Sequence, residues 1–252
     1  MNLILEVGLN HFGNLKESKK YLNFFLKSDF KFITYQIQKE IFYKKFKFKL
    51  PIDHYEYLIN QVHKKNKKIG LAVADIKSCQ DIAKLNFDFY KILSISLSDK
   101  KLIQFIKKFK KPIFVSCGTA SNSQIQRCVS SFSNFEKKNL NLIHTSLSYE
   151  DVDQNLKRIR LLKNFHQQLS YGHHYKNYLP LIMLMYSDIE YFFVYIKSID
   201  SKKRVYPDDN HAFSFKSLEK IKKIISECEN LLGSKNKRNK HIKIINDEKV
   251  SF

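Results

Sequence analysis

The sequence predicts a single-domain (β/α)8 TIM barrel. Three observations support this prediction: eight short apolar runs recur along the chain, helix-length amphipathic segments rich in lysine separate them, and the chain has 252 residues. Strict alternation of strands and helices favours a parallel sheet, and about 250 residues is typical of an eight-unit barrel. We therefore expect the barrel over residues 1–233 and a basic, disordered tail over residues 234–252.

Each predicted strand is short and bounded by turn-forming or polar residues, as buried parallel strands are. In chain order the runs are Leu3 to Leu9, Lys31 to Ile37, Lys68 to Ala74, Asp88 to Ser94, Lys111 to Cys117, Asn139 to Ser146, Gln167 to Gly172 and Glu190 to Ile196.

The predicted helices carry apolar residues three and four positions apart, with lysines on the opposite face. Asp151 and Ser214 are suitable N-caps, Ser98-Asp99 opens a helix, and Gly233 follows the last periodic residue. The clearest helices lie near Lys16 to Ser28, Ile52 to Asn66, Ser98 to Lys110, Glu150 to Asn164 and Ser214 to Gly233.

Composition limits the class of protein. The chain is 43% hydrophobic, but no apolar stretch approaches the ~20 residues needed to span a membrane, so we expect a soluble protein. Glu6 interrupts the first apolar run and no basic region precedes it, which argues against a secretory signal. Cys79, Cys117, Cys128 and Cys228 form no CxxC pair and have no His at metal-ligand spacing. They favour reduced packing thiols in a cytoplasm.

A net charge of +21 suggests nucleic-acid binding as one functional class. Only five of the 45 basic residues are Arg, so 45 − 5 = 40 are Lys, and these are spread over nearly every helix. Base readout depends on the bidentate geometry of Arg, so solvated lysine faces are the favoured interpretation and no specific nucleic-acid partner is expected. Residues 234–243 are the exception, because this cluster could bind polyanions weakly.

Chemistry in such barrels sits where the strands end. Lys91 lies inside a predicted strand, where burial is costly unless an anion or a carboxylate such as Asp75 is its partner. Glu6, inside the first strand, must face the barrel or be paired. Ser116 and Gly118 form either a simple tight turn or a loop whose backbone donors hold phosphate.

Taken in order, the strand ends resemble the sialic acid synthase family of phosphoenolpyruvate-condensing barrels. The family pattern E-I-G-x-N-H-x-G aligns with Glu6 to Gly13, K-I-x-S with Lys91 to Ser94, and K-P-x-x-x-S-T-G-M-A with Lys111 to Ala120. H-C-x-S-x-Y aligns with His144 to Tyr149, and the final H-A-F-S stands at His211 to Ser214. The resemblance covers residues 3 to about 233.

The resemblance implies an aldol-like condensation. The enol carbon of phosphoenolpyruvate attacks the aldehyde of an N-acetylated amino sugar, N-acetylmannosamine or a related aldose, and water attack then releases phosphate. The product is a nine-carbon 2-keto acid for surface polysaccharide biosynthesis. The matching positions are Lys91, Ser94 and Ser116 for phosphoenolpyruvate, Glu6, Gln36 and Tyr149 for the sugar, and His174 for a divalent Mn or Mg ion, with Glu6 and Lys91 catalytic.

The chain departs from the family pattern at five site positions: Thr34 replaces a Lys, Ser96 a Glu, Ser148 an Asn, Ile196 the second metal His, and Asn210 an Asp. Residues that could replace the missing metal ligand are His173, Asp208, Asp209 and His211.

The family's C-terminal antifreeze-like lid domain has no counterpart in the residues after Gly233. We therefore expect either a homodimer or another partner to supply a lid. The altered positions leave a second function open: a catalytically impaired family member that serves as a binding or accessory subunit in the same pathway.

Overall fold

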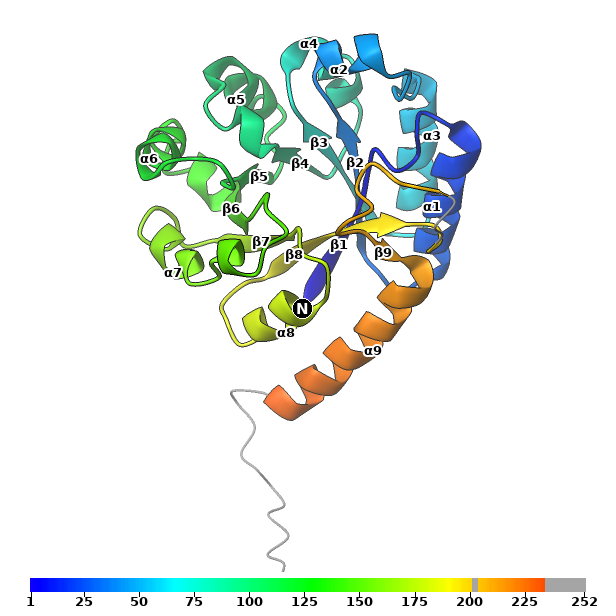
Figure 1. Ribbon diagram of the computed structural model, residues 1–252. Helices are drawn as coiled ribbons and strands as arrows, with labels where there is room; N and C mark the ends of the chain where they lie inside the picture. Colours follow the sequence, from blue (N-terminus) through cyan, green and yellow to red (C-terminus); the bar gives the residue numbers. More distant parts are fainter. Residues whose placement is uncertain (201–203, 234–252) are drawn as a thin grey trace, which may run out of the picture.

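The computed structural model describes residues 1–200 and 204–233, and it confirms the predicted barrel. Eight parallel strands are hydrogen-bonded in sequence order, and β1 also pairs with β8, which closes the sheet. Figure 1 shows helices arranged around these strands. The strands are β1 Asn2–Gly8, β2 Phe32–Ile37, β3 Lys68–Val73, β4 Phe89–Ile92, β5 Ile113–Ser116, β6 Leu140–Thr145, β7 Leu169–His173 and β8 Tyr191–Lys197.

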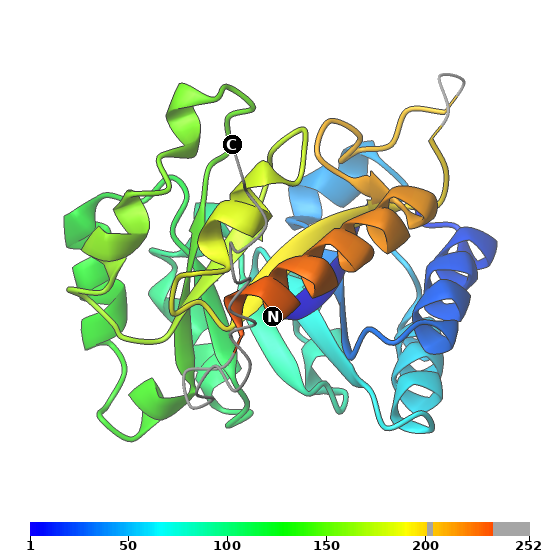
Figure 2. The same ribbon diagram turned by 90° about the horizontal axis from the view of Figure 1, so that it is seen from below.

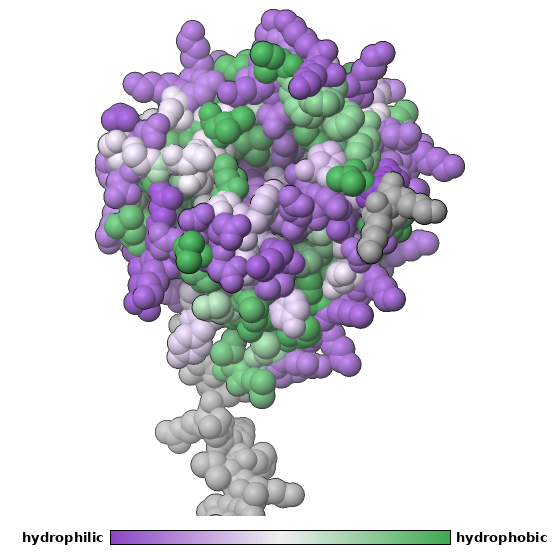
Figure 3. Space-filling view, viewed as in Figure 1, coloured by the Kyte–Doolittle hydropathy of each residue, from purple (hydrophilic) through white to green (hydrophobic). Residues whose placement is uncertain are grey.

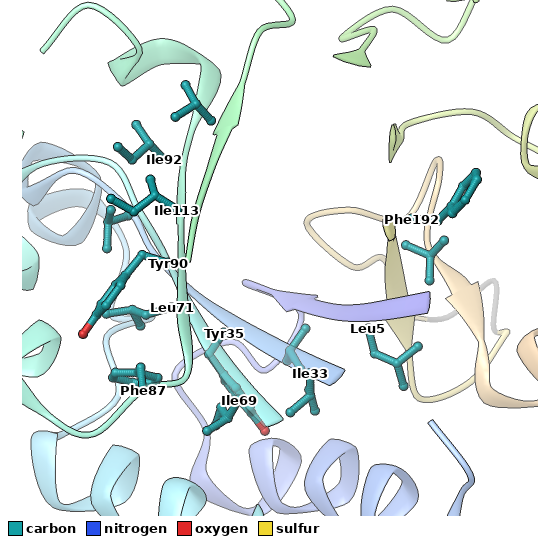
Figure 4. Close-up of a cluster of buried hydrophobic side chains, with 14 of the residues drawn as sticks. Leu5, Ile33, Tyr35, Ile69, Leu71, Phe87, Tyr90, Ile92, Ile113 and Phe192 are labelled. Atoms are coloured by element: carbon teal, nitrogen blue, oxygen red, sulfur yellow. The ribbon is translucent and has the colours of Figure 1, made fainter. Parts of the chain in front are cut away.

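Alternate residues of each strand face opposite sides of the sheet. In β1, Leu3, Leu5 and Val7 belong to the large core between strands and helices. Figure 4 shows this layer, with side chains such as Leu5 and Ile69 on the strands. The intervening residues therefore face the barrel interior, and they prepare the floor of the candidate site.

Aromatic rings fill the lower interior of the barrel. Ile4, Phe89, Phe114, Ile143 and Phe193 form a second buried cluster, separate from the outer core. The Phe114 ring lies 5.6 Å from that of Phe89 and 5.1 Å from that of Phe193, both edge to face. Because inward residues recur every second position, the next inward side chains above Ile4 and Phe89 are those of residues 6 and 91.

Helix starts follow local capping chemistry. The side chains of Asp99 and Ser214 accept hydrogen bonds from backbone N–H groups of α5 and α9, which confirms both predicted starts. The helices are α1 Leu15–Lys27, α2 Glu40–Lys45, α3 Ile52–His63, α4 Ile76–Cys79, α5 Lys100–Lys107, α6 Asn122–Ser130, α7 Arg158–Leu162, α8 Leu179–Leu184 and α9 Phe215–Leu232.

The predicted helix from 150 to 164 is wrong. A 3-10 turn covers Val152–Gln154, Asn155 adopts a left-handed conformation with φ of 37°, and α7 begins only at Arg158. A left-handed residue ends a right-handed helix. Asp151 makes no capping hydrogen bond and instead accepts one from the Tyr175 hydroxyl at 2.5 Å.

The C-terminal helix α9 lies along the flank of the barrel (Figure 2). It follows β9, Phe213–Ser214, which pairs with the end of β8 at Ile196. The N-terminal ammonium group forms an ion pair with Glu229 of α9. The predicted tail, 234–252, lies outside the described residues.

Figure 3 shows hydrophilic side chains along most of the outline of the face in view and hydrophobic side chains at its lower edge. No helix among residues 1–200 and 204–233 is long and apolar enough to cross a bilayer. All four cysteines are free; Cys79, Cys117 and Cys128 are buried and Cys228 is half-buried.

Candidate active site

A buried ion pair occupies the centre of the barrel mouth. Lys91 Nζ of β4 lies 2.5 Å from Glu6 Oε1 of β1, and the two residues are 3% and 1% exposed. The structure corrects the alternative partner for Lys91, since Asp75 instead caps α4 through Ser78 N and accepts from Glu40 N. Sequence reasoning singled out Glu6 and Lys91 separately, and the fold brings them together.

Small residues on β3 allow Lys91 to reach across the barrel. The register places Gly70 beside Thr34 and Ala72 beside Lys91, so little side-chain volume stands between β4 and β1. A Cβ at Gly70 would overlap the Phe89 ring. The ammonium group also lies 4.8 Å from the centroid of the Phe193 ring, a favourable cation–π contact.

One carboxylate oxygen of Glu6 is available to interact with a bound molecule. Its Oε2 atom is buried and has no hydrogen-bond partner in the described structure. Burial raises the pKa of Glu6, and Lys91 opposes that shift. A buried, unpartnered carboxylate oxygen can accept a proton or a hydroxyl from a bound molecule.

Two hydroxyl groups and a backbone amide meet at the ends of β4 and β5. Ser94 Oγ lies 2.9 Å from Ser116 Oγ, and Gly118 N donates to Ser94 Oγ at 3.3 Å. A Cβ at Gly118 would lie 2.8 Å from Thr145 Cγ2, so only glycine fits there without movement. Backbone and hydroxyl donors at a strand end are suited to binding phosphate or carboxylate oxygens.

Of the three residues predicted near the sugar, Glu6 belongs to the ion pair, while Gln36 and Tyr149 lie in contact with a neighbouring aromatic group. The Tyr195 hydroxyl of β8 donates to Gln36 Oε1 of β2 at 3.2 Å. Tyr149 is 40% exposed, and its ring stacks on that of His211 with centroids 5.7 Å apart. Gln36 and Tyr149 are thereby both connected to the Tyr195 side chain, whose ring lies 4.7 Å from that of His211.

The predicted metal ligand His174 lies beside another histidine of the mouth, His211. The two rings stack with centroids 4.4 Å apart and planes 13° apart. Burial lowers the pKa of His211 to about 4, and burial also lowers that of His174. His173 faces the outer layer and stacks on Phe213.

The donor set does not fit the divalent metal that the resemblance implies. Among residues 1–200 and 204–233 no group of three His, Cys, Asp or Glu side chains is arranged to hold a metal ion. Ile196, at the second ligand position, is fully buried in the outer core.

Asp208 approaches the pair from the loop before β9. Leu9 N donates to its Oδ2 at 3.4 Å, and Asp208 N donates to Asn10 Oδ1 at 3.0 Å. Gly8, with φ of +56°, makes room for this carboxyl group, because a Cβ there would overlap Asp208. Burial, with a smaller contribution from Glu6, raises the pKa of Asp208 to about 7, although the Leu9 N–H and Lys91 oppose the shift.

Sequence reasoning gave no role to Tyr195 or Phe193. Both rings lie within 6 Å of Lys91 Nζ, at 5.7 and 4.8 Å. The signal was available in β8, where Tyr191, Phe193 and Tyr195 recur at the two-residue period of one strand face.

Comparison with solved structures supports the same architecture. The N-acetylneuraminic acid (sialic acid) synthetase of Leptospira borgpetersenii, solved with citrate, superposes with a TM-score of 0.82 at 21% identity, covering 94% of this chain and 86% of that one. A putative spore coat polysaccharide biosynthesis protein E of Chromobacterium violaceum gives 0.79 at 19% identity, covering 94% and 77%. At these identities the likeness shows the fold.

Sequence comparison is more specific. The uncharacterized protein MJ1065 of Methanocaldococcus jannaschii is 28% identical over 189 residues, which are 68% of this chain and 55% of that protein. The chain thus spans about half the length of this curated relative. The NeuB family model matches residues 12–237, which is most of the chain; Lys91 lies within the match and Glu6 precedes it. The chain belongs to the NeuB family.

Proposed function

We propose that this protein is a sialic-acid-synthase-like enzyme that condenses phosphoenolpyruvate with an N-acetylated amino sugar and releases phosphate. The observation that carries the proposal is the buried Lys91 of β4, together with the bonded hydroxyls of Ser94 and Ser116 and the Gly118 N–H that donates to Ser94, at the ends of β4 and β5. One cation with several neutral donors is suited to a small molecule that bears both carboxylate and phosphate.

The proposed chemistry assigns a task to each side of the mouth. Lys91 and the two serines hold phosphoenolpyruvate, so that its C3 carbon bonds to the sugar aldehyde carbon and the aldehyde oxygen takes up a proton. Gln36 and Tyr149 orient the sugar. Water then adds to C2, and Glu6 Oε2 accepts one of its two protons. The C2–O bond to phosphate breaks as the other proton passes from the new C2 hydroxyl to the departing phosphate, which leaves the 2-keto acid, while the proton on the former aldehyde oxygen comes from solvent. This scheme uses only side chains of this chain.

The setting of the reaction is also part of the proposal. We place it in the cytoplasm, where free thiols such as the buried Cys117 stay reduced. We further propose that a second copy or another partner covers the mouth, since Tyr149 at its rim is 40% exposed.

A test begins with titration calorimetry of phosphoenolpyruvate, with and without manganese, followed by an assay of phosphate release with N-acetylmannosamine. Lys91→Met should abolish both binding and turnover. Lys101→Met, at an exposed position of α5, is the matched control and should change neither. Absence of binding to the unaltered protein would contradict the proposal.

A second function is favoured by a specific observation: Glu6 neutralises Lys91, and Thr34 supplies no replacement cation. A weakened anion site suits an accessory subunit that binds the sugar without converting it. Binding of N-acetylmannosamine with no phosphate release, under conditions where a known synthase turns over, would establish this alternative.

A further inference from the structure

Arg158, in the outer ring of helices, forms hydrogen bonds with the turn after β5, residues 116–120. This residue is the first of α7, and its Nη2 donates to Ala120 O at 2.6 Å while its Nη1 donates to Gly118 O at 3.5 Å. The two terminal nitrogens of one planar guanidinium group therefore donate hydrogen bonds to two carbonyls of the same turn. The contacts join segments 38 and 40 residues apart in the sequence.

This turn carries anion-binding groups of the proposed site. Gly118 N donates to Ser94 Oγ, and Ser94 is in turn bonded to Ser116. A Cβ on Gly118 would meet Thr145 at 2.8 Å and Ser94 Oγ at 3.0 Å, so the turn is packed tightly between its neighbours. A shift of Gly118 would disturb its hydrogen bond to Ser94 Oγ.

The hydrogen bonds from Arg158 fix the orientation of one peptide group in the turn. The peptide between Gly118 and Thr119 is trans, so its N–H points opposite to its C=O. Since the Gly118 carbonyl faces Arg158, the Thr119 N–H points away from α7. In the part of the chain that the structure describes, this N–H has no acceptor, and its partner carbonyl is polarised by a cation.

The charge of Arg158 is also uncompensated within residues 1–200 and 204–233, because no carboxylate pairs with it there. Its field reaches the end of β6: burial lowers the pKa of His144, and Arg158 lowers it further. By contrast, the charge of Lys91 is offset by Glu6 at 2.5 Å.

We propose that Arg158 is a positioning residue that completes the anion site. It fixes the turn so that the Thr119 N–H and the Ser94 and Ser116 hydroxyls face the bound anion, and it supplies from behind the positive charge that Thr34 does not. The inference rests on the proposed function, since the anion is the phosphate or carboxylate group of phosphoenolpyruvate.

The test compares Arg158→Met and Arg158→Lys with Arg160→Met, an exposed arginine on the same helix. Arg158→Met should raise the Kd and KM for phosphoenolpyruvate roughly tenfold, as expected for one partly screened charge, and leave kcat within about twofold. Arg158→Lys keeps the charge but loses the fork, so we expect an intermediate loss of about threefold. Arg160→Met should match the unaltered protein.

Binding of N-acetylmannosamine separates positioning from a merely structural role. Its Kd should be unchanged in all three variants, whereas a general loss of structure would weaken both ligands together. Equal affinity of Arg158→Met and the unaltered protein for phosphoenolpyruvate would overturn the role of Arg158 and leave the proposed function standing. No binding by the unaltered protein would overturn both. If circular dichroism shows that Arg158→Met does not fold, Arg158→Lys decides by the same comparison.

Discussion

The ion pair between Glu6 and Lys91 makes a strong prediction about stability. Both side chains are almost fully buried, so replacing Lys91 with the similarly shaped Met leaves a carboxylate buried with no counter-charge. Breaking a buried pair in this way costs about 3–5 kcal/mol. Glu6→Gln leaves an uncompensated ammonium group and should cost a similar amount. In the double variant both charges are gone, and its loss should be no greater than that of either single variant.

The direction of the pH dependence tests the cause. Burial already holds the pKa of Glu6 above its usual 4.5, and in Lys91→Met the opposing effect of Lys91 is lost. A carboxyl group with a raised pKa in the folded state binds more protons when folded, so stability falls as pH rises from the unfolded pKa through the folded one. The deficit of Lys91→Met should therefore be small at pH 5 and full at pH 8.

Urea titration followed by circular dichroism measures these differences, with equal m-values required for comparison. Lys101→Met is the control for loss of one lysine. Additive losses in the double variant, or a Lys91→Met protein within about 1 kcal/mol of the unaltered one at pH 8, would refute the reasoning.

Three further predictions follow from the mouth and floor of the barrel. Gly70→Ala would force its Cβ into the Phe89 ring and should cost about 2 kcal/mol, seen as a lower thermal midpoint; an unchanged midpoint would contradict this packing. Asp208 has its pKa raised from 3.8 to about 7, so its contribution to stability falls as pH rises between these values; because the side chain is partly exposed we expect about 2 kcal/mol, and urea titrations of Asp208→Asn should lack that slope. Thr34→Lys places a second cation beside Glu6 and should tighten phosphoenolpyruvate binding about tenfold by calorimetry, while weaker binding would show that position 34 does not face the anion.

The barrel could be predicted because its signal is local and repeated. Each strand pattern needs only a few neighbouring residues, and all eight predicted runs contain their observed strands or differ from them by one residue at an end. Helices α2, α4, α6 and α8 were not predicted. Three of them, α2, α4 and α8, have six residues or fewer, which give too little periodicity, whereas α6 has nine residues and was missed. The helix from 150 failed for a different reason: the apolar spacing suited a helix, but the left-handed Asn155 interrupts it.

The individual site residues could be predicted from the sequence, but the residues that they contact in the fold could not. Burial of a charge within a strand pattern identified Glu6 and Lys91 one at a time. Their contact spans 85 residues and depends on the small size of Gly70 and Ala72 on an intervening strand. A contact of that kind is set by barrel closure and strand register.

The charges around the mouth determine how well the site can bind an anion, and therefore which function it can have. An incoming anion competes with Glu6 for Lys91, because one ammonium group cannot compensate both fully. The family pattern would add a lysine at position 34, whereas this chain has Thr34 and, behind the β5 turn, Arg158, which has no carboxylate partner among residues 1–200 and 204–233. In the function that we propose, charge would therefore be supplied through oriented peptide and hydroxyl dipoles more than by direct ion pairing. Such dipoles select for geometry and cost less desolvation than a second buried cation.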